Sequence, residues 1–231
     1  INLPYMKIII AGAGEVGRHL AKMLSTDNQD IILLDQNQAR LDVIDAKYNF
    51  MTWNGSPYSF ATLSDINVAD ADLFIAVTPY ETNNIVACCI AKQLGAKKTV
   101  ARIDNSEFLV PKYGRTINEL GVNEMIYPEN LAANEIATAL NHNWARYWGE
   151  LHDGKLLLVG VKIYNQSKLL NVKLKDLPVT THDFHIAAIR RNNRTIIPNG
   201  NDEIMDGDIV YFITTPDHVD IVRDLCGKVQ R

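Results

Sequence analysis

The sequence predicts an α/β protein: a Rossmann-like, doubly wound parallel sheet followed by a second, smaller α+β domain. Over the first half of the chain, short runs rich in Ile and Val alternate with helical patterns. A glycine-rich corner joins the first such run to the first helical pattern. From residue 151 on, short strands separated by Asn, Gly, Asp and Pro turns take over. We therefore expect a first domain over 6–127, a helix and linker over 128–150, and a second domain over 151–231.

The first domain should contain parallel strands covered by helices on both faces, because strands and helices alternate along it. The expected strands cover 7–11, 30–34, 50–53, 72–77, 99–103 and 124–127. The expected helical connections cover 16–24, 39–47, 58–66, 83–94 and 107–120, and a further helix over 129–141 leads out of the sheet.

The first helix carries apolar residues at helical spacing. Val16, Leu20, Met23 and Leu24 fall at i, i+4, i+7 and i+8. We expect these four side chains to form one stripe that packs on the sheet.

Three glycines follow the first strand directly, in the order G-x-G-x-x-G, and open the first helix. In such a corner Gly12 permits the tight turn, Gly14 lets the backbone approach a pyrophosphate, and Gly17 allows close packing of helix on strand. The N–H groups and the dipole at the helix start attract phosphates. The pattern alone is a weak signal, because glycine-rich turns also occur where a chain merely needs a positive φ.

Asp35 strengthens this interpretation. It ends the second strand, 18 positions after Gly17. A carboxylate there accepts hydrogen bonds from ribose hydroxyls and repels a 2′-phosphate. We therefore predict a dinucleotide or adenine nucleotide, with NAD(H) preferred over NADP(H).

Two later strand ends should face the same crevice. Thr78 and Pro79 follow the fourth expected strand, and Arg102 lies near the end of the fifth. Thr78 and Pro79 fit a helix start as well as they fit a binding site. For Arg102 a phosphate contact is favoured over a structural ion pair, because an arginine among apolar strand residues needs an anionic partner.

Composition narrows the partners. The formal charge is −4, from 23 basic and 27 acidic residues without a basic cluster, so nucleic acid is not expected as a partner. No apolar run is long enough to span a bilayer, so we expect no membrane insertion. Cys88, Cys89 and Cys226 cannot make a disulfide framework; they fit a reducing cytoplasm and should be small buried hydrophobes.

Signs of catalysis are missing. The six histidines are scattered, and neither a metal-binding spacing nor a nucleophile elbow occurs. His182, Asp183 and His185 could suggest metal ligands, but such a group near a turn is more often a surface feature. A β-rich domain of about 80 residues is also small for a substrate domain. We therefore expect neither a catalytic residue nor a metal site, and binding without turnover.

The residues resemble a known family. "MKIIIAGAGEVGRHLAKML" and "ADADLFIAVTPYETNNIVACCIAKQLGAKKTVARIDN" are similar to the nucleotide-binding regulatory domains of bacterial potassium uptake systems, the TrkA type, also called RCK or KTN domains. "LLNVKLKDLP" and "IAAIRRNNRTIIPNGNDEIMDGDIVYFI" resemble the companion C-terminal domain, whose turns match Pro198, Gly200, Gly207 and Asp208. The resemblance covers nearly the whole chain.

The resemblance implies a cytoplasmic regulatory subunit that binds NAD(H) or ATP/ADP. Such subunits pair through a crossover helix, here 129–141, and assemble as homo-oligomeric rings. They lie at the inner face of the membrane and gate a potassium-transporting subunit of the TrkH or KtrB kind. The nucleotide contacts would come from the phosphate loop, the ribose acid and two later strand ends: Gly12, Ala13, Gly14, Glu15, Val16, Asp35, Thr78, Pro79 and Arg102.

The sequence departs from the family pattern in two places. Glu81-Thr82-Asn83-Asn84 replaces the usual Asp-Glu-x-Asn, and Asn171 stands where a glycine is common. The last residues read like the start of a second tandem unit, so an N-terminal half is one hypothesis. The alternative functions are an NAD-dependent oxidoreductase with an unidentified substrate and a redox-sensing transcription factor, the latter without a visible helix-turn-helix.

Overall fold

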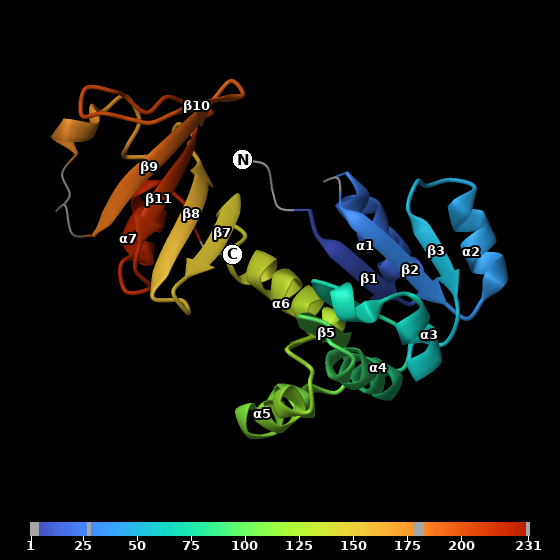
Figure 1. Ribbon diagram of the computed structural model, residues 1–231. Helices are drawn as coiled ribbons and strands as arrows, with labels where there is room; N and C mark the ends of the chain where they lie inside the picture. Colours follow the sequence, from blue (N-terminus) through green and yellow to red (C-terminus); the bar gives the residue numbers. More distant parts are fainter. Residues whose placement is uncertain (1–4, 27–28, 178–182, 230–231) are drawn as a thin grey trace. The chain divides into compact units, whose positions relative to one another are not determined.

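The computed structural model describes residues 5–26, 29–177 and 183–229 (Figure 1). Contacts divide the chain into two compact units, one ending at Ala132 and the other beginning at Ala133. The strands of the first unit are β1 (Lys7–Ala11), β2 (Asp30–Asp35), β3 (Met51–Asn54), β4 (Leu73–Ala76), β5 (Lys98–Arg102) and β6 (Glu124–Ile126). Its helices are α1 (Glu15–Ser25), α2 (Gln38–Asp45), α3 (Phe60–Asp65), α4 (Glu81–Gln93) and α5 (Pro111–Glu119), and α6 (Pro128–Asn141) leads on from it.

The six strands form one parallel sheet in the order β3-β2-β1-β4-β5-β6. This confirms the doubly wound sheet expected from the alternation of strands and helices. The strand order reverses direction between β1 and β4, and a crevice opens at such a switch point, at the carboxyl ends of the strands. The loops after β1, β2 and β4 therefore determine what this domain can bind.

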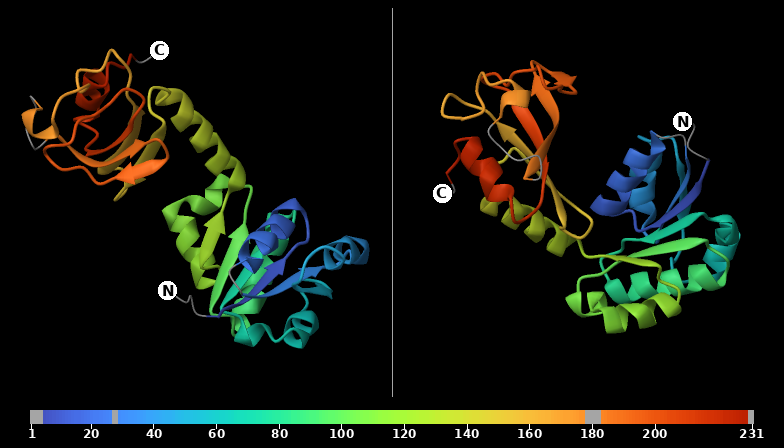
Figure 2. Two further views of the ribbon diagram at one scale, coloured as in Figure 1. Left: turned by 90° about the horizontal axis from the view of Figure 1, so that it is seen from above. Right: turned by 90° about the vertical axis from the view of Figure 1, so that its left-hand side faces the viewer.

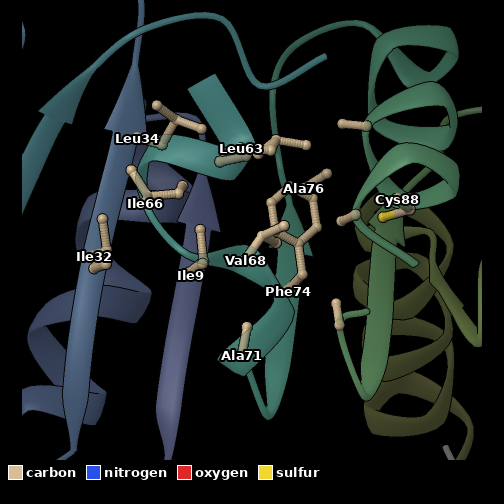
Figure 3. Packing of buried hydrophobic residues seen from close by; sticks show 14 of the residues in the cluster. Ile9, Ile32, Leu34, Leu63, Ile66, Val68, Ala71, Phe74, Ala76 and Cys88 are labelled. Carbon is tan, nitrogen blue, oxygen red and sulfur yellow. The ribbon is translucent and has the colours of Figure 1, made fainter. Parts of the chain in front are cut away.

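Both faces of the sheet are buried, which explains why its strands are apolar at successive positions. On one face, Ile9 of β1 packs with Leu63 and Phe74 in a cluster that includes residues of α4 (Figure 3). On the opposite face, Ile8 and Ile10 pack with buried residues of α1 and α2. Successive side chains of a strand point to opposite faces, so one apolar run supplies both cores.

Helix α1 packs differently from the expected stripe. Val16 and Met23 are 44% and 58% exposed, whereas Gly17 and Ala21 are buried. Leu20 packs against the core cluster only in part, as Leu24 does. The reason is the close approach of the helix to the β1 corner, where a Cβ on Gly17 would overlap the carbonyl oxygen of Gly12. Small residues therefore form the contact line, and two of the four large apolar side chains point away from it.

One expected helix is divided in two. Instead of a continuous helix over 107–120, a 3-10 helix covers Ser106–Leu109 and α5 begins at Pro111. Proline is tolerated in the first turn of a helix, but it disfavours helical backbone at the residue before it. Val110 is accordingly extended, with ψ of 126°.

A buried amide joins the ends of β4 and β5. Asn84 on α4 is completely buried, and its Oδ1 accepts from the Thr78 backbone N–H at 2.9 Å and from Thr78 Oγ1 at 2.6 Å. Its Nδ2 donates to the carbonyl oxygens of Thr78 at 3.0 Å and Arg102 at 2.9 Å. One side chain thus fixes the two strand ends beside the switch point.

The second unit has a five-stranded antiparallel sheet in the order β10-β9-β11-β8-β7, with α7 (Val219–Leu225) packed on it (Figure 2). Its strands are β7 (Tyr147–Leu151), β8 (Leu156–Lys162), β9 (Phe184–Arg191), β10 (Arg194–Ile196) and β11 (Ile209–Thr214). This confirms a second, smaller α+β unit. The expected linker over 128–150 needs correction, because four residues of β7 fall inside it. Those residues pair with β8, a partner that the sequence around Gly149 did not reveal.

Two features of the second unit bear on the sequence comparison. Arg191 forms two hydrogen bonds with the buried carboxylate of Asp208, at 2.9 and 2.7 Å, and the pKa of Arg191 is raised by this bonding. Asn171, which stands where the family commonly has glycine, adopts φ of 58°. Asparagine tolerates this left-handed conformation better than most residues.

The Gly17→Ala variant should be less stable than the natural chain by about 1–3 kcal/mol, because the new methyl group has no space against Gly12. Gly14→Ala is the matched control, since a Cβ at Gly14 meets no atom within 4 Å. Urea unfolding followed by circular dichroism measures both. Equal stability of the two variants would contradict the close contact.

The Asn84→Ala variant should lose about 1–3 kcal/mol of unfolding free energy, because it leaves buried backbone groups of Thr78 and Arg102 without their partner. Asn83→Ala, which changes a half-buried neighbour at the same helix start, should have a much smaller effect. Thermal and urea unfolding compare the two. A loss no greater than that of Asn83→Ala would show that the amide does not secure the strand ends.

Candidate functional site

The glycine corner after β1 has the geometry of an anion-binding loop. The Gly12 N–H still donates to Leu34 O of β2 at 2.8 Å, and the φ of +112° at Gly12 then turns the chain out of the sheet. Gly14 is extended at the position before α1, and the first helical bond runs from Arg18 N–H to Gly14 O at 3.0 Å. The corner thus needs glycine at position 12 for its backbone conformation.

The start of α1 exposes backbone donors. No side chain within the described part of the chain caps this helix, and Gly14, Glu15 and Val16 precede the first amide that bonds within it. Amides at a helix start lack intrahelical acceptors and carry the positive end of the helix dipole. Glu15 points into solvent and pairs with Arg18 at 2.7 Å, so its charge is partly neutralised. The helix start can therefore receive a phosphate.

Asp35 connects the loops after β1 and β2. Its Oδ2 accepts from Ala13 N–H at 2.6 Å and its Oδ1 accepts from Asn37 N–H at 2.8 Å. The carboxylate side chain is only 12% exposed. A carboxylate has about four acceptor positions, so Asp35 can hold the glycine loop and still accept hydrogen bonds from a ligand hydroxyl.

Arg40 is a residue of this site that the sequence reasoning missed. Asn37 caps α2 by accepting from Arg40 N–H at 3.2 Å, and this cap sets the helix so that Arg40 Nη1 lies 3.9 Å from Asp35 Oδ2. The Arg40 side chain is about half exposed and adds a positive charge beside the carboxylate. An arginine five residues after the ribose acid, in the first turn of a capped helix, is the signal that could have revealed it.

Two adjoining cavities lie at this edge of the sheet and share Arg40. The first, of about 300 Å³, brings together Gly12, Asp35, Thr78 and Pro79 of the predicted site. Its other lining residues are Leu34, Gln36, Arg40, Pro57, Tyr58, Tyr80 and Asn83. The second, of about 420 Å³, is lined by Ala13, Gly14, Glu15, Arg18, Asn37, Ala39, Arg40, Val43 and Ile44. Val16 and Arg102 line neither cavity.

Thr78 and Pro79 directly precede the start of α4 and also border the first cavity. Thr78 is tied to Asn84 through its backbone and hydroxyl, and Tyr80 and Glu81 then begin α4. Both residues also line the first cavity. The helix start therefore forms one wall of the crevice.

Arg102 makes an ion pair in this conformation. Its Nη2 lies 2.8 Å from Glu129 Oε1 at the start of α6, and the side chain is about a quarter exposed. The favoured expectation was a phosphate contact, and the ion pair is the alternative that was weighed against it. The ion pair is in contact with solvent mainly through Glu129, which is half exposed.

Glu81 occupies the place where the sequence departs from the family pattern. Its Oε2 accepts from the N–H groups of Asp104 at 3.0 Å and Asn105 at 2.9 Å. Burial raises the pKa of Glu81, but these backbone hydrogen bonds outweigh it, so the pKa lies below its usual value. The hydrogen bond with Glu81 raises the pKa of Asp104. The acidic side chain of this loop is therefore used to hold the segment after β5.

None of the three cysteines lines either of the two cavities. Burial raises the pKa of the Cys88 and Cys226 thiols to about 12, so both stay protonated; Cys89 is half-buried.

Of the group His182, Asp183 and His185, His182 lies outside the described residues. Among those described, no group of three or more His, Cys, Asp or Glu side chains could hold a metal ion. The same residues contain no helix long and apolar enough to cross a membrane.

The arrangement can bind a sugar attached to a phosphate. The amides at the start of α1 suit a phosphate, and Asp35 lies one loop away, where it can accept from hydroxyl groups. Tyr58, Tyr80 and Pro57 add apolar surface to the cavity wall for a flat ring. The residues present thus include groups that suit each part of a nucleotide: a phosphate, a sugar and a flat base.

Comparison with known proteins agrees with this description. Residues 8–128 match the TrkA-N domain and residues 158–227 match the TrkA-C domain. The Trk system potassium uptake protein TrkA of Haemophilus influenzae is 34% identical over 230 residues, covering 98% of this chain and 50% of that protein. A TrkA homolog of Archaeoglobus fulgidus is 29% identical, covering 96% of this chain and 50% of that protein. The chain spans about half the length of the curated relatives it matches.

Solved structures share the fold. The GsuK channel bound to NAD aligns with a TM-score of 0.65 at 15% identity, over 98% of this chain and 41% of that one. The TrkA-N domain of the inner membrane protein ybaL from Escherichia coli aligns with a TM-score of 0.52 at 16% identity, over 60% of this chain and 99% of that one. The two family matches cover the parallel sheet and, apart from β7 and the start of β8, the antiparallel sheet. The chain belongs to the TrkA-N domain family and carries a TrkA-C domain after it.

Proposed function

We propose that this chain is the nucleotide-binding regulatory part of a bacterial potassium uptake system and that it gates a membrane potassium transporter in response to NAD(H) or ATP/ADP. In this proposal it is a regulator and not an enzyme. It acts at the cytoplasmic face of the membrane, where a TrkH- or KtrB-like subunit would be its partner. Two relatives that are named Trk system potassium uptake protein TrkA support this assignment.

One observation carries the nucleotide part of the proposal. The Asp35 carboxylate holds the Ala13 amide of the glycine loop at 2.6 Å and lines the same cavity as Gly12 and Thr78. Phosphate donors and a sugar acceptor are therefore held in a fixed relation before any ligand arrives. A preorganised site loses less conformational freedom on binding, which favours affinity.

NAD(H) is the first candidate, and ATP or ADP is the alternative. Asp35 disfavours a 2′-phosphate by charge repulsion, which favours NAD(H) over NADP(H). GsuK, which shares the fold, has been solved with NAD and with ADP. The proposed contacts are Gly12, Ala13, Gly14, Glu15 and Val16 of the loop, then Asp35, Thr78, Pro79 and Arg102, with Arg40 added by the structure.

Helix α6 supports the proposed pairing of two copies. None of its residues is buried, and Leu131, Ile136 and Leu140 are each more than half exposed. Apolar side chains so exposed on one helix are typical of an interaction surface. We infer that α6 is the crossover helix of a dimer and that such dimers build the ring.

Gating requires that the nucleotide bind two conformations of the assembly with different affinity. A ligand shifts a conformational equilibrium only by its differential affinity for the two states. The crevice lies between the loops after β1, β2 and β4, so small shifts of these loops alter the nucleotide contacts. The transporter would respond to the conformation that the nucleotide favours.

Asp35→Ala should weaken binding of NAD(H), and of ADP or ATP if these bind, by about tenfold or more, since a charged hydrogen-bond acceptor contributes about 1.5–3 kcal/mol. Isothermal titration calorimetry measures this. Asp42→Ala, which removes an exposed carboxylate of α2, is the matched control and should bind as the natural chain does.

Potassium flux through vesicles containing the cognate membrane subunit should vary with the same nucleotide and become insensitive to it in Asp35→Ala.

Unchanged affinity in Asp35→Ala would remove Asp35 from the site. Tight nucleotide binding with no change in flux would contradict the gating role and leave the binding site in place. Oxidation or reduction of the nicotinamide with any member of a substrate panel, read from its absorbance, would favour an oxidoreductase instead.

Ile136→Lys should shift the chain from dimer to monomer, weakening association by at least about tenfold, because it places a charge on the proposed apolar contact. The contact tested is the side of α6 that carries Ile136 and Leu140, which are four residues apart. Asn134→Lys is the control for that side, since residues two apart on a helix project to nearly opposite sides. Sedimentation velocity measures both. Dissociation by both substitutions, or by neither, would contradict pairing through this face.

A further inference from the structure

A group of cations gathers around one tyrosine ring in the second unit. Lys228 Nζ lies 4.2 Å from the centroid of the Tyr164 ring, and Lys162 Nζ lies 5.5 Å from the same centroid. Arg146 lies near enough to lower the pKa of Lys228 through its charge. We call Arg146, Lys162, Tyr164 and Lys228 the Tyr164 cluster.

The cluster is assembled from segments far apart in the sequence. Arg146 precedes β7 and donates its N–H to Gly160 O at 2.7 Å, while Lys162 ends β8. Lys228 follows α7, and the chain reaches it through Gly227, whose φ is +65°. Three elements thus bring their charges to one place.

The end of α7 is fixed against the segment after β8. Leu225 O accepts from Ser167 Oγ at 3.0 Å and from Lys168 N–H at 2.9 Å. A Cβ on Gly227 would lie 2.5 Å from Gln166 O, so the two segments touch through backbone. The position of Lys228 beside Tyr164 is therefore built into the fold and does not depend on its side chain alone.

The positive charges of the cluster are not used in ion pairs within the described residues. Within residues 5–26, 29–177 and 183–229, no ion pair includes Arg146, Lys162 or Lys228. Burial lowers the pKa of Lys228, and the charges of Arg146 and Lys162 lower it further. Tyr164 and Cys226 oppose this effect, and no Asp or Glu side chain contributes. Like charges held together without an anion repel one another, and an anionic ligand would relieve that repulsion.

We propose that the Tyr164 cluster binds the phosphate group of a small anionic ligand, at a second site separate from the crevice of the first unit. Lysine supplies a mobile point charge for phosphate and arginine a planar pair of donors. The Tyr164 ring holds the Lys228 ammonium group by a cation–π contact, which restricts the conformations of the lysine side chain. The site needs no residue of the nucleotide crevice.

Inorganic pyrophosphate is the probe, with the amide resonances of Gly227 and Lys228 followed by nuclear magnetic resonance in the full chain. These amides should shift in a saturable way on titration. Lys228→Gln should weaken that binding by about tenfold or more. Lys155→Gln removes the same charge from an exposed lysine at the opposite end of β8 and should leave the affinity unchanged.

Three outcomes would overturn the proposal: no shift at Gly227, a shift that does not saturate, or equal weakening by Lys155→Gln and Lys228→Gln. Both variants should have the same unfolding temperature as the natural chain. A loss of binding then cannot be attributed to unfolding. Pyrophosphate bound at the glycine loop would shift the Gly12 and Gly14 amides instead. One titration therefore tests the proposal for the Tyr164 cluster and the proposal for the glycine loop separately.

Discussion

The contact between Gly12 and Gly17 is the constraint on which the crevice at the carboxyl ends of the strands depends. Because Gly17 has no Cβ, helix α1 starts directly against the backbone of Gly12 at the end of β1. This closeness points the amides of the helix start at the switch point of the sheet, between β1 and β4. It also explains why small residues form the line along which α1 meets the core. A helix set further away would leave the amides and Asp35 too far apart to share a ligand.

The rest of the crevice is held by polar groups that face inward from neighbouring loops. Asp35 ties the glycine loop to the start of α2, and Asn84 ties the end of β4 to the end of β5. Buried polar groups are costly when unpaired and rigid when fully bonded. The walls of the site are therefore fixed by the same hydrogen bonds that complete the fold.

The second unit uses charge in two contrasting ways. The Arg191–Asp208 pair is enclosed, with the carboxylate almost completely buried, and it secures a turn of the sheet. The Tyr164 cluster has three cations and no recorded carboxylate partner among the described residues. A paired charge contributes to structure, whereas unpaired like charges keep an unfavourable energy that a ligand can remove. This difference separates the structural arginine from the proposed ligand site.

The sequence by itself determined the doubly wound sheet, the glycine corner and the place of Asp35, because these follow from local periodicity and fixed spacing. It did not reveal Arg40 or the fourfold bonding of Asn84. It also favoured a phosphate contact for Arg102, where the structure has an ion pair with Glu129. Such contacts join residues from different elements, and their distances are set by how helices dock on the sheet. Tertiary structure alone decided them, because a side chain's partners depend on packing that no single stretch of sequence encodes.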